Sequence, residues 1–227
     1  MAILPLRLDI LPPEQREVRN DLGQVPRHFV LYGGTAVALR LGHRQSVDFD
    51  FFTEQPIDPL AFQATLPFLQ GAVAIQTAAN TVSYSLSRSG WTQPVKFSFF
   101  GGLTGGRVGV PDRAGNGLQI ASLLDLAAHK LKVLLVRAEK KDLLDLDAIF
   151  RSGISVNDAA GALMAITGGA YDPAHSVKGL AYFGDGDLNE LPLDVKGRLT
   201  AAANRFSGPS AISLQSETLA LAHPHSA

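Results

Sequence analysis

A strand–turn–helix–strand pattern early in the chain restricts the fold more than any other feature. His28–Tyr32 is rich in β-forming residues and runs into Gly33 and Gly34, which predicts a strand that ends in a tight turn. Thr35–Leu41 has helical character and begins with a residue that can cap a helix. Val47–Phe52 alternates between polar and apolar residues, so it predicts a second strand close to the first.

The second strand carries two carboxylates on one face. Residues two apart on a strand point to the same side, so Asp48 and Asp50 share a face while Val47, Phe49 and Phe51 point into the core. Two carboxylates this close repel each other unless a cation or a proton intervenes, and Mg²⁺ prefers oxygen ligands. The pattern therefore indicates a magnesium site. The alternative is an edge strand with a solvated acidic face.

The turn at Gly33, Gly34 and Thr35 predicts a place for an anion. Glycine lets the backbone approach a ligand closely, and the N–H groups at a helix N-terminus favour phosphate. Taken alone, the pattern also fits an ordinary turn. The short connection to Asp48 brings the second strand beside the first, so the phosphate cradle and the metal face should meet at one edge of the sheet. Phosphoryl-type transfer needs this arrangement.

The remaining elements predict an α+β fold, in which a mixed-sheet unit precedes a helical unit. We expect units at residues 1–117 and 118–206, followed by a flexible tail at 207–227. Predicted strands are Val73–Ile75, Thr81–Ser87, Val95–Phe100 and Arg107–Val110, and predicted helices are Glu14–Leu22, Pro59–Leu69, Leu123–Arg137 (capped by Ser122), Lys140–Arg151, Asn157–Ile166 and Pro192–Phe206.

Composition excludes several classes of site. The absence of cysteine excludes disulfides, thiolate nucleophiles and cysteine-ligated zinc. The 20 basic and 21 acidic residues nearly cancel, so the chain has no overall basic footprint for nucleic acid. No apolar stretch reaches the length of a membrane span, so we expect a cytoplasmic protein that does not bind membranes.

A second charged pattern follows at Leu126–Phe150. Positions 130, 134, 137, 141 and 145 step by three or four residues, so Lys130, Arg137, Lys141 and Asp145 share one face if the stretch is a single helix. A lysine and an arginine on that face could reach a triphosphate. Asp142 or Asp145 could hold those cations in place or contact the incoming base or acceptor. The alternative is an amphipathic helix with Lys–Asp pairs on its solvent face.

Together these letters resemble a known family. LYGGTAVALRLGHRQSVDFDFF is similar to the G-G-[S/T]…D-x-D signature of DNA polymerase β-like nucleotidyltransferases, and in detail to the AbiEii/AbiGii-type nucleotidyltransferase toxins. Those proteins are the enzymatic half of bacterial toxin–antitoxin and phage-defence systems. The segment from Lys130 to Asp145 resembles their later motif, K-(x6)-R-(x3)-[R/K]-D-x-x-D. The resemblance implies a nucleotidyltransferase-type sheet with flanking helices, followed by a helical C-terminal region.

The resemblance also implies an activity and its residues. The expected reaction is Mg²⁺-dependent transfer of a nucleoside monophosphate from an NTP to an acceptor hydroxyl, on a tRNA 3′ end or a protein, with an antitoxin protein as a further partner. The catalytic candidates are Asp48, Asp50, Lys130 and Asp142, with two Mg²⁺ ions held by Asp48 and Asp50. The nucleotide-binding candidates are Gly33, Gly34, Thr35, Arg44, Ser46, Lys130, Arg137, Lys141 and Asp145.

One position departs from the family pattern. The superfamily usually has a third carboxylate on a later strand, where this chain has Ser98, with Lys96 on the same face. In one alternative, two carboxylates are enough for catalysis. In another, Asp112 supplies the third carboxylate from the following loop. A third alternative is a degenerate module that binds nucleotide without transfer. A protein-interaction role as half of a toxin–antitoxin pair is a further alternative.

Overall fold

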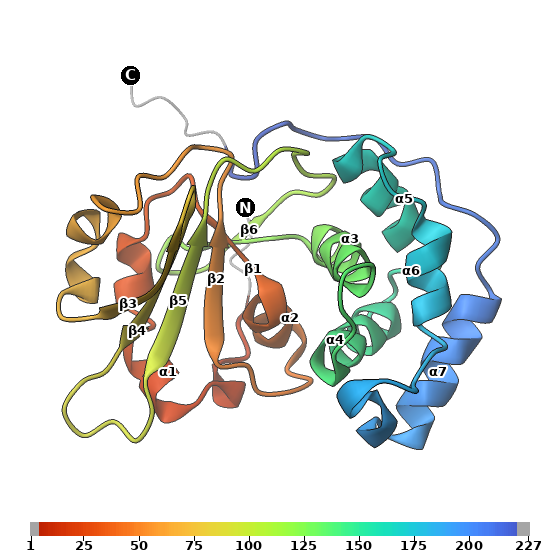
Figure 1. Cartoon of the computed structure of the whole chain (residues 1–227), viewed down its shortest axis with the longest axis horizontal. Helices are drawn as coiled ribbons and strands as arrows, with labels where there is room; N and C mark the ends of the chain where they lie inside the picture. The colour runs from red at the N-terminus through yellow and green to blue at the C-terminus, as the bar shows by residue number, and fades with distance from the viewer. Residues whose placement is uncertain (1–4, 222–227) are drawn as a thin grey trace.

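A seven-stranded mixed sheet forms one side of the protein, as the computed structural model shows for residues 5–221 (Figure 1). The strand order is β3-β4-β5-β2-β1-β7-β6, in which the β2–β5 and β1–β7 pairs are parallel and the others antiparallel. The strands are β1 (Val30–Tyr32), β2 (Asp48–Phe52), β3 (Val73–Ala78), β4 (Thr81–Leu86), β5 (Val95–Phe100), β6 (Asp112–Arg113) and β7 (Gln119–Ile120). The predicted α+β class is confirmed.

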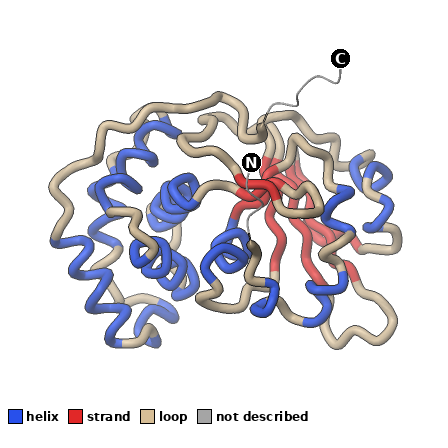
Figure 2. Tube along the Cα trace, turned by 180° about the vertical axis from the view of Figure 1, so that it is seen from behind, coloured by secondary structure: helices blue, strands red, loops and turns tan. Residues whose placement is uncertain are grey.

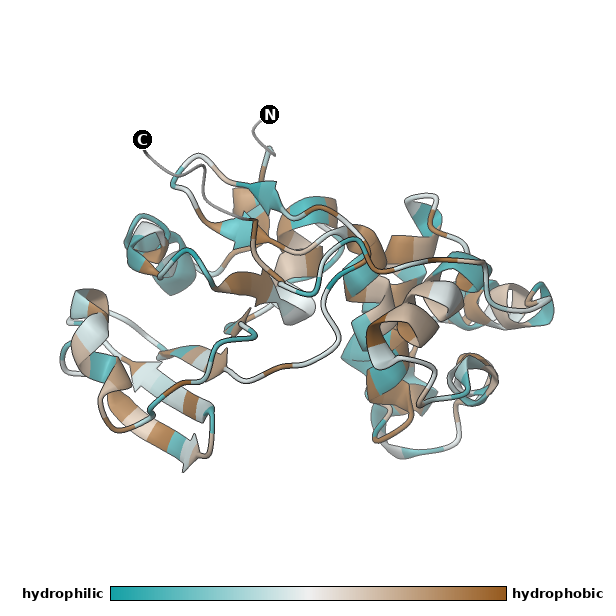
Figure 3. Ribbon diagram, turned by 90° about the horizontal axis from the view of Figure 1, so that it is seen from above, coloured by the Kyte–Doolittle hydropathy of each residue, from teal (hydrophilic) through white to brown (hydrophobic). Residues whose placement is uncertain are grey.

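The helices that follow residue 120 gather on the other side of the molecule, as the views from behind and from above show (Figures 2 and 3). Helix α2 lies between the sheet and the C-terminal helices and contacts β2, α3 and α4. Among residues 5–221, no helix is both long and apolar enough to cross a bilayer. The helices are α1 (Pro13–Glu17), α2 (Gly33–Leu41), α3 (Leu123–Leu134), α4 (Lys140–Arg151), α5 (Val156–Thr167), α6 (Pro173–Gly179) and α7 (Leu193–Asn204).

An aromatic core covers one face of the sheet and leaves the other face for the site. Phe49 and Phe51 on β2 stack on their β5 neighbours Phe97 and Phe99, with ring centroids 5.3 and 5.1 Å apart. Phe62 packs on the same layer, with its ring centroid 4.8 Å from that of Phe99. All four strand phenylalanines are fully buried, so the alternation of β2 directs the aspartates to the opposite face.

Two expected elements are wrong. Pro59–Leu69 forms two 3₁₀ turns, η3 (Phe62–Thr65) and η4 (Pro67–Leu69), because the residue before Pro67 is held out of the helical region. Arg107–Val110 is not a strand and forms only an isolated bridge from Arg107 to Ser216. The short strands β6 and β7 were missed. The boundary at residue 117 stays a prediction, and β7 pairs with β1 from beyond it.

The expected flexible tail at 207–227 stays a prediction, although its residues 207–221 form hydrogen bonds with the rest of the chain. Residues 207–221 run along α5 and return to the sheet (Figure 1). Ser210 N donates to Asn157 O at 2.9 Å, Gln215 N donates to Arg107 O at 2.9 Å, and Leu221 N donates to Gln119 Oε1 at 2.8 Å. These bonds occupy backbone groups that a frayed tail would leave to water. Residues 222–227 of the expected tail lie outside the described residues.

Candidate active site

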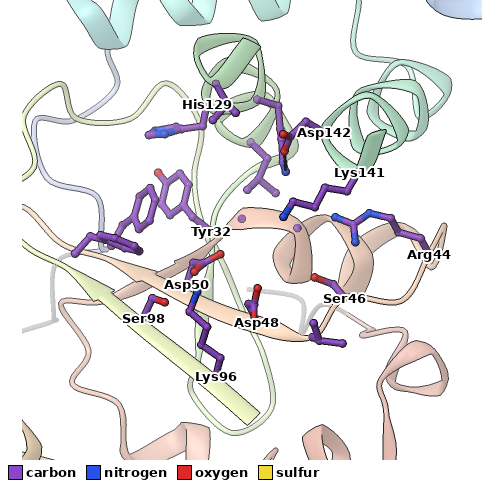
Figure 4. Close-up of a pocket in the computed structure, with 18 of the residues that line it drawn as sticks. Tyr32, Arg44, Ser46, Asp48, Asp50, Lys96, Ser98, His129, Lys141 and Asp142 are labelled. Atoms are coloured by element: carbon purple, nitrogen blue, oxygen red, sulfur yellow. Dashed lines mark hydrogen bonds and ion pairs between the residues drawn. The ribbon is translucent and has the colours of Figure 1, made fainter. Parts of the chain in front are cut away.

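A cavity of about 490 Å³ lies between the polar face of the sheet and helices α3 and α4 (Figure 4). Asp48 and Asp50 line it from β2, Lys96 and Ser98 from β5, and Gly33 and Gly34 from the start of α2. The helical side contributes His129, Lys130, Arg137, Lys141 and Asp142, and the return loop after α2 contributes Arg44 and Ser46. The cavity thus brings together residues from both sequence motifs.

Asp48 and Asp50 share the cavity face, as their spacing indicated. Burial raises the pKa of the Asp50 carboxyl, and the charge of Asp48 raises it further, against the opposing charges of Lys96 and Lys130. A site that disfavours two ionised carboxylates becomes favourable when a cation neutralises them. Val47 is 50% exposed, contrary to expectation, because β2 begins only at Asp48.

The donor set fits Mg²⁺ shared with a ligand. Asp48 and Asp50 supply oxygen atoms, and in residues 5–221 no group of three or more His, Cys, Asp or Glu side chains is placed to hold a metal ion. Mg²⁺ is commonly held by one or two carboxylates, with phosphates and water completing its octahedral shell. The arrangement therefore suits an ion that arrives with a triphosphate better than a closed structural metal site.

The two glycines let backbone approach the acidic and basic groups of the cavity. Gly33 has φ +70°, and a Cβ there would lie 2.5 Å from Asp50 Oδ2. A Cβ on Gly34 would overlap the Arg44 guanidinium. The positive φ favours glycine at position 33, and the lack of side chains at both positions leaves the first turn of α2 beside the carboxylates and the Arg44 side chain. The N–H groups of that turn face a cavity where a phosphate would be stabilised.

Thr35 does not line this cavity. Its side chain is fully buried, and its hydroxyl contacts the Asp48 carbonyl oxygen and Ser46 Oγ, the latter at 2.9 Å. The Thr35 hydroxyl is therefore already engaged, and the expected part of Thr35 in binding nucleotide stays a prediction for its backbone N–H. Thr35 fastens the start of α2 to the start of β2 and so fixes the distance between the phosphate cradle and the carboxylates.

Asp145 is a buried hub rather than a lining residue. One carboxylate oxygen accepts from Arg44 Nε at 2.6 Å and lies 2.7 Å from His43 Nε2, while the other lies 2.9 Å from Arg44 Nη2 and 2.6 Å from Lys130 Nζ. Burial alone would raise the pKa of Asp145, but the hydrogen bonds and the positive charges lower it to about 2. Asp145 therefore holds Arg44 and Lys130 in place, which is one of the two roles expected for it, and its contact with nucleotide or acceptor stays a prediction.

Lys130 and Asp142 meet across the two helices. Lys130 Nζ donates to Asp142 Oδ1 at 2.8 Å, and both residues are almost completely buried. The other oxygen, Asp142 Oδ2, is buried with no hydrogen-bond partner among the described residues. Because Asp142 lines the cavity, a small movement of its side chain would open this oxygen to a hydrogen bond from a bound ligand.

The single-helix interpretation of the second motif is wrong. Helix α3 ends at Leu134 and α4 begins at Lys140, so Arg137 lies in the connection between them. Arg137 and Lys141 both line the cavity, and both pair with Glu139, in the case of Lys141 at 2.8 Å. The residues of the second motif meet at the cavity because α3 and α4 pack together as a helical hairpin.

The position of the third carboxylate is filled by a hydroxyl. Ser98 lies directly opposite Asp50 in the β2–β5 register, and its hydroxyl accepts a hydrogen bond from Ser83 at 3.0 Å. Asp112 does not reach the cavity. It lies on β6 at the far edge of the sheet and pairs with Arg40 at 2.8 Å, so the alternative that it supplies the missing carboxylate is wrong.

Sequence reasoning missed the aromatic end of the cavity. The rings of Tyr32 and Phe52 stack with centroids 4.8 Å apart, and His129 packs edge-on against Tyr32 at 4.8 Å. Phe100 extends this end from β5. The signal was a histidine immediately before Lys130, which alone is typical of an interface residue. Burial, with a smaller effect from the charge of Lys132, lowers the pKa of His129 to about 4, so the ring is neutral.

This buried histidine predicts a loss of stability in acid. The unfolded chain binds a proton near the ordinary pKa of 6.5 and the folded chain only near 4, so stability falls as the pH drops through that window. The loss from this residue reaches about 3 kcal/mol. The measurement is urea unfolding at neutral and acidic pH. The free energy of unfolding should fall less on acidification in His129→Gln than in wild type, whereas in His175→Gln, at an exposed position, it should fall as much as in wild type. Equal acid losses in wild type and His129→Gln would contradict the prediction.

Comparison with known proteins identifies relatives of this arrangement. The sequence profile of the AbiEii toxin, a nucleotidyl transferase of a type IV TA system, matches residues 18–212. The chain is 33% identical over 147 residues to the uncharacterised protein aq_aa25 of Aquifex aeolicus (strain VF5), a match that covers 62% of this chain and 68% of that protein.

Two crystal structures share the fold. A candidate nucleotidyltransferase from H. pylori aligns with a TM-score of 0.56 and 19% identity, covering 84% of this chain and 91% of that one. JHP933 from Helicobacter pylori aligns with a TM-score of 0.55 and 19% identity, covering 86% and 92%. At this identity the likeness concerns the fold, and it confirms the predicted nucleotidyltransferase-type sheet with flanking helices.

Proposed function

Since the chain belongs to the AbiEii nucleotidyltransferase toxin family, we propose that it transfers a nucleoside monophosphate from an NTP to an acceptor hydroxyl, with Mg²⁺ held by Asp48 and Asp50. The observation that carries the proposal is the meeting of these carboxylates with the N-terminal turn of α2 in one cavity that Lys130 closes from the helical side. The groups that would bind phosphate therefore lie next to the carboxylates that would bind the metal ion.

The cavity has a basic end and an aromatic end, with the carboxylates between them. Figure 4 shows Arg44 and Lys141 on one side of Asp48 and Asp50, and Tyr32 and His129 on the other. The β- and γ-phosphates of an NTP would lie at the basic end, near Gly34, where guanidinium and ammonium groups bind their oxygens. The nucleoside would extend toward the aromatic end, where rings offer stacking surfaces.

The reaction needs the α-phosphate at the carboxylates. A bound Mg²⁺ supplies neutralisation of the phosphate charge and polarises the reacting oxygens. Arg44 and Lys130, both held by Asp145, orient the triphosphate for in-line displacement of pyrophosphate. Asp142 Oδ2 accepts a hydrogen bond from a hydroxyl of the nucleotide or of the acceptor. Thr35, through its hydroxyl, and Asp145 act as positioning residues.

The acceptor is proposed to be the 3′ end of a tRNA or a side-chain hydroxyl of a protein, and the biological role that of a toxin restrained by an antitoxin protein. Family membership supports both ideas. The formal net charge of −1 argues against a broad RNA-binding surface and favours a small footprint around the accepting hydroxyl.

A second candidate function is nucleotide binding without transfer. The observation that favours it is Ser98, which replaces a carboxylate opposite Asp50. Pyrophosphate release that requires Mg²⁺ would exclude this candidate, whereas tight binding of an NTP without release of pyrophosphate would support it.

The first test is thermal unfolding with each of the four NTPs, with and without Mg²⁺. A nucleotide present at about a hundred times its Kd stabilises the native state by about 2.7 kcal/mol, which raises the Tm by several degrees in a chain of this size. We expect one nucleotide to give this shift only with Mg²⁺. If no nucleotide shifts the Tm under either condition, the cavity is not a preformed donor site.

A further inference from the structure

Lys96 differs from the other cations of the cavity because it forms no close ion pair, although its charge acts on the nearby Asp50 carboxyl. Arg44 pairs with Asp145, Lys130 with Asp142 and Asp145, and Arg137 and Lys141 with Glu139. Lys96 makes no ion pair within 4 Å in the described part of the chain, although it lines the same cavity. A half-buried ammonium group without a close ion pair retains its capacity to bind an anionic ligand.

The sheet places this lysine beside the carboxylates. Lys96 pairs with Asp48 in the parallel β2–β5 register, and Ser98 pairs with Asp50, so all four side chains share one face. Figure 4 shows the Lys96 side chain extending from β5 toward Asp50. On the opposite side of β2 the cavity is bounded by the first turn of α2. A phosphate at the carboxylates would therefore lie between Lys96 and the helix N-terminus.

Charge balance indicates what Lys96 does there. Two carboxylates carry two negative charges, which one Mg²⁺ neutralises, and the phosphate still brings its own negative charge. A second Mg²⁺ would need further oxygen ligands, but Ser98 adds no charge and the ammonium group on the same face repels a cation. Lys96 already supplies positive charge at this position, without a metal.

We propose that Lys96 is a phosphate-binding catalytic residue that contacts the α-phosphate beside Asp48 and Asp50 and takes the place of a second Mg²⁺ ion. The site then works with one Mg²⁺ in place of the two that the sequence suggested. This inference rests on the proposed function, because it assumes that a triphosphate occupies the cavity. To the proposed function, the inference adds a residue that lies outside both sequence motifs. It also specifies the number of bound metal ions.

The test uses the full chain with the non-transferable α,β-methylene analogue of each NTP in turn. Binding of the Mg²⁺ complex is measured by calorimetry for wild type, Lys96→Met and Lys96→Arg, with Lys132→Met as the matched control. Lys132 lies on α3 and contacts Tyr171 outside the cavity. Loss of a charged hydrogen bond should weaken binding about ten- to a hundred-fold in Lys96→Met. Lys96→Arg should recover most of the affinity, and the control should match wild type.

Metal stoichiometry gives an independent readout. Electron paramagnetic resonance of Mn²⁺ titrated into wild type with saturating analogue should show one bound ion per chain. Two ions, or a Lys96→Met affinity within about two-fold of wild type, overturn the inference while the proposed function stands. If wild type binds none of the four analogues, the proposed function fails and this inference fails with it. Should Lys96→Met not unfold cooperatively, Lys96→Gln replaces it, and the wild-type metal count decides in any case.

Discussion

Replacing Asp50 with asparagine should reduce nucleotidyl transfer by about a thousand-fold or more, because the variant loses half of the carboxylate pair that holds Mg²⁺ at the reacting phosphate. The fold should persist. Burial and the charge of Asp48 already disfavour the ionised Asp50 carboxylate, so a neutral amide relieves repulsion in metal-free buffer. The variant should therefore combine lost activity with equal or higher thermal stability, a pair of effects that misfolding cannot produce.

The measurement is transfer of radiolabel from an α-labelled NTP into total RNA or total protein, with and without Mg²⁺. Asp112→Asn is the matched control, because Asp112 is a half-exposed aspartate on the same sheet that pairs with Arg40 away from the cavity. The control should retain transfer close to the wild-type level. Wild-type transfer by Asp50→Asn would remove the carboxylate pair from the proposed mechanism, and loss of transfer in Asp112→Asn would show that a remote carboxylate matters.

The sequence predicted the first half of the site because local rules determine it. The two-residue period of β2 buries Phe49 and Phe51 and so turns Asp48 and Asp50 to the other face. The turn at Gly33 was also predicted, since a strand that meets glycine and then a helix has few other conformations. These features depend on neighbours in the chain.

The second half of the site depends on contacts between distant segments, which periodicity does not report. The spacing of Lys130 and Asp145 suggested one helix face, but the chain bends between Leu134 and Lys140, and the residues meet across a helix hairpin. Asp145 was a candidate for binding nucleotide. In the structure, Arg44, about a hundred residues earlier in the chain, donates hydrogen bonds to both of its carboxylate oxygens. The burial of Asp145 results from the packing of α4 against α2, a contact between distant segments that the sequence pattern does not indicate.

The hydroxyl of Thr35 and the segment after Phe206 are two further cases in which contacts between distant residues could not be predicted from the sequence pattern. A threonine after two glycines is chemically suited to phosphate, and only the position of Ser46 and of the Asp48 carbonyl shows that its hydroxyl is already engaged. The polar, small residues of 207–221 favour disorder by composition. In the structure, their backbone bonds to Arg107 and Asn157 replace those with water.

The hub at Asp145 leads to the largest stability effect that we expect. Asp145→Asn removes the negative charge that Arg44 and Lys130 share in a buried position, and breaking a buried ion pair by removing one partner costs about 3–5 kcal/mol. For a chain of this length the Tm should fall by about 10 °C. Transfer should also fall, because Lys130 and Arg44 lose their fixed orientation toward the triphosphate.

The wild-type advantage should depend on pH in a defined direction. The folded pKa of Asp145 lies at about 2, below its ordinary 3.8, so its contribution is complete above 3.8 and is lost as the pH falls toward 2. The Tm difference between wild type and Asp145→Asn should therefore be constant near neutrality and shrink in strong acid. Asp194→Asn is the control, because Asp194 is exposed and pairs with the partly exposed Arg198, so its loss should cost much less. Equal losses at both positions would mean that Asp145 contributes no more than an ordinary ion pair.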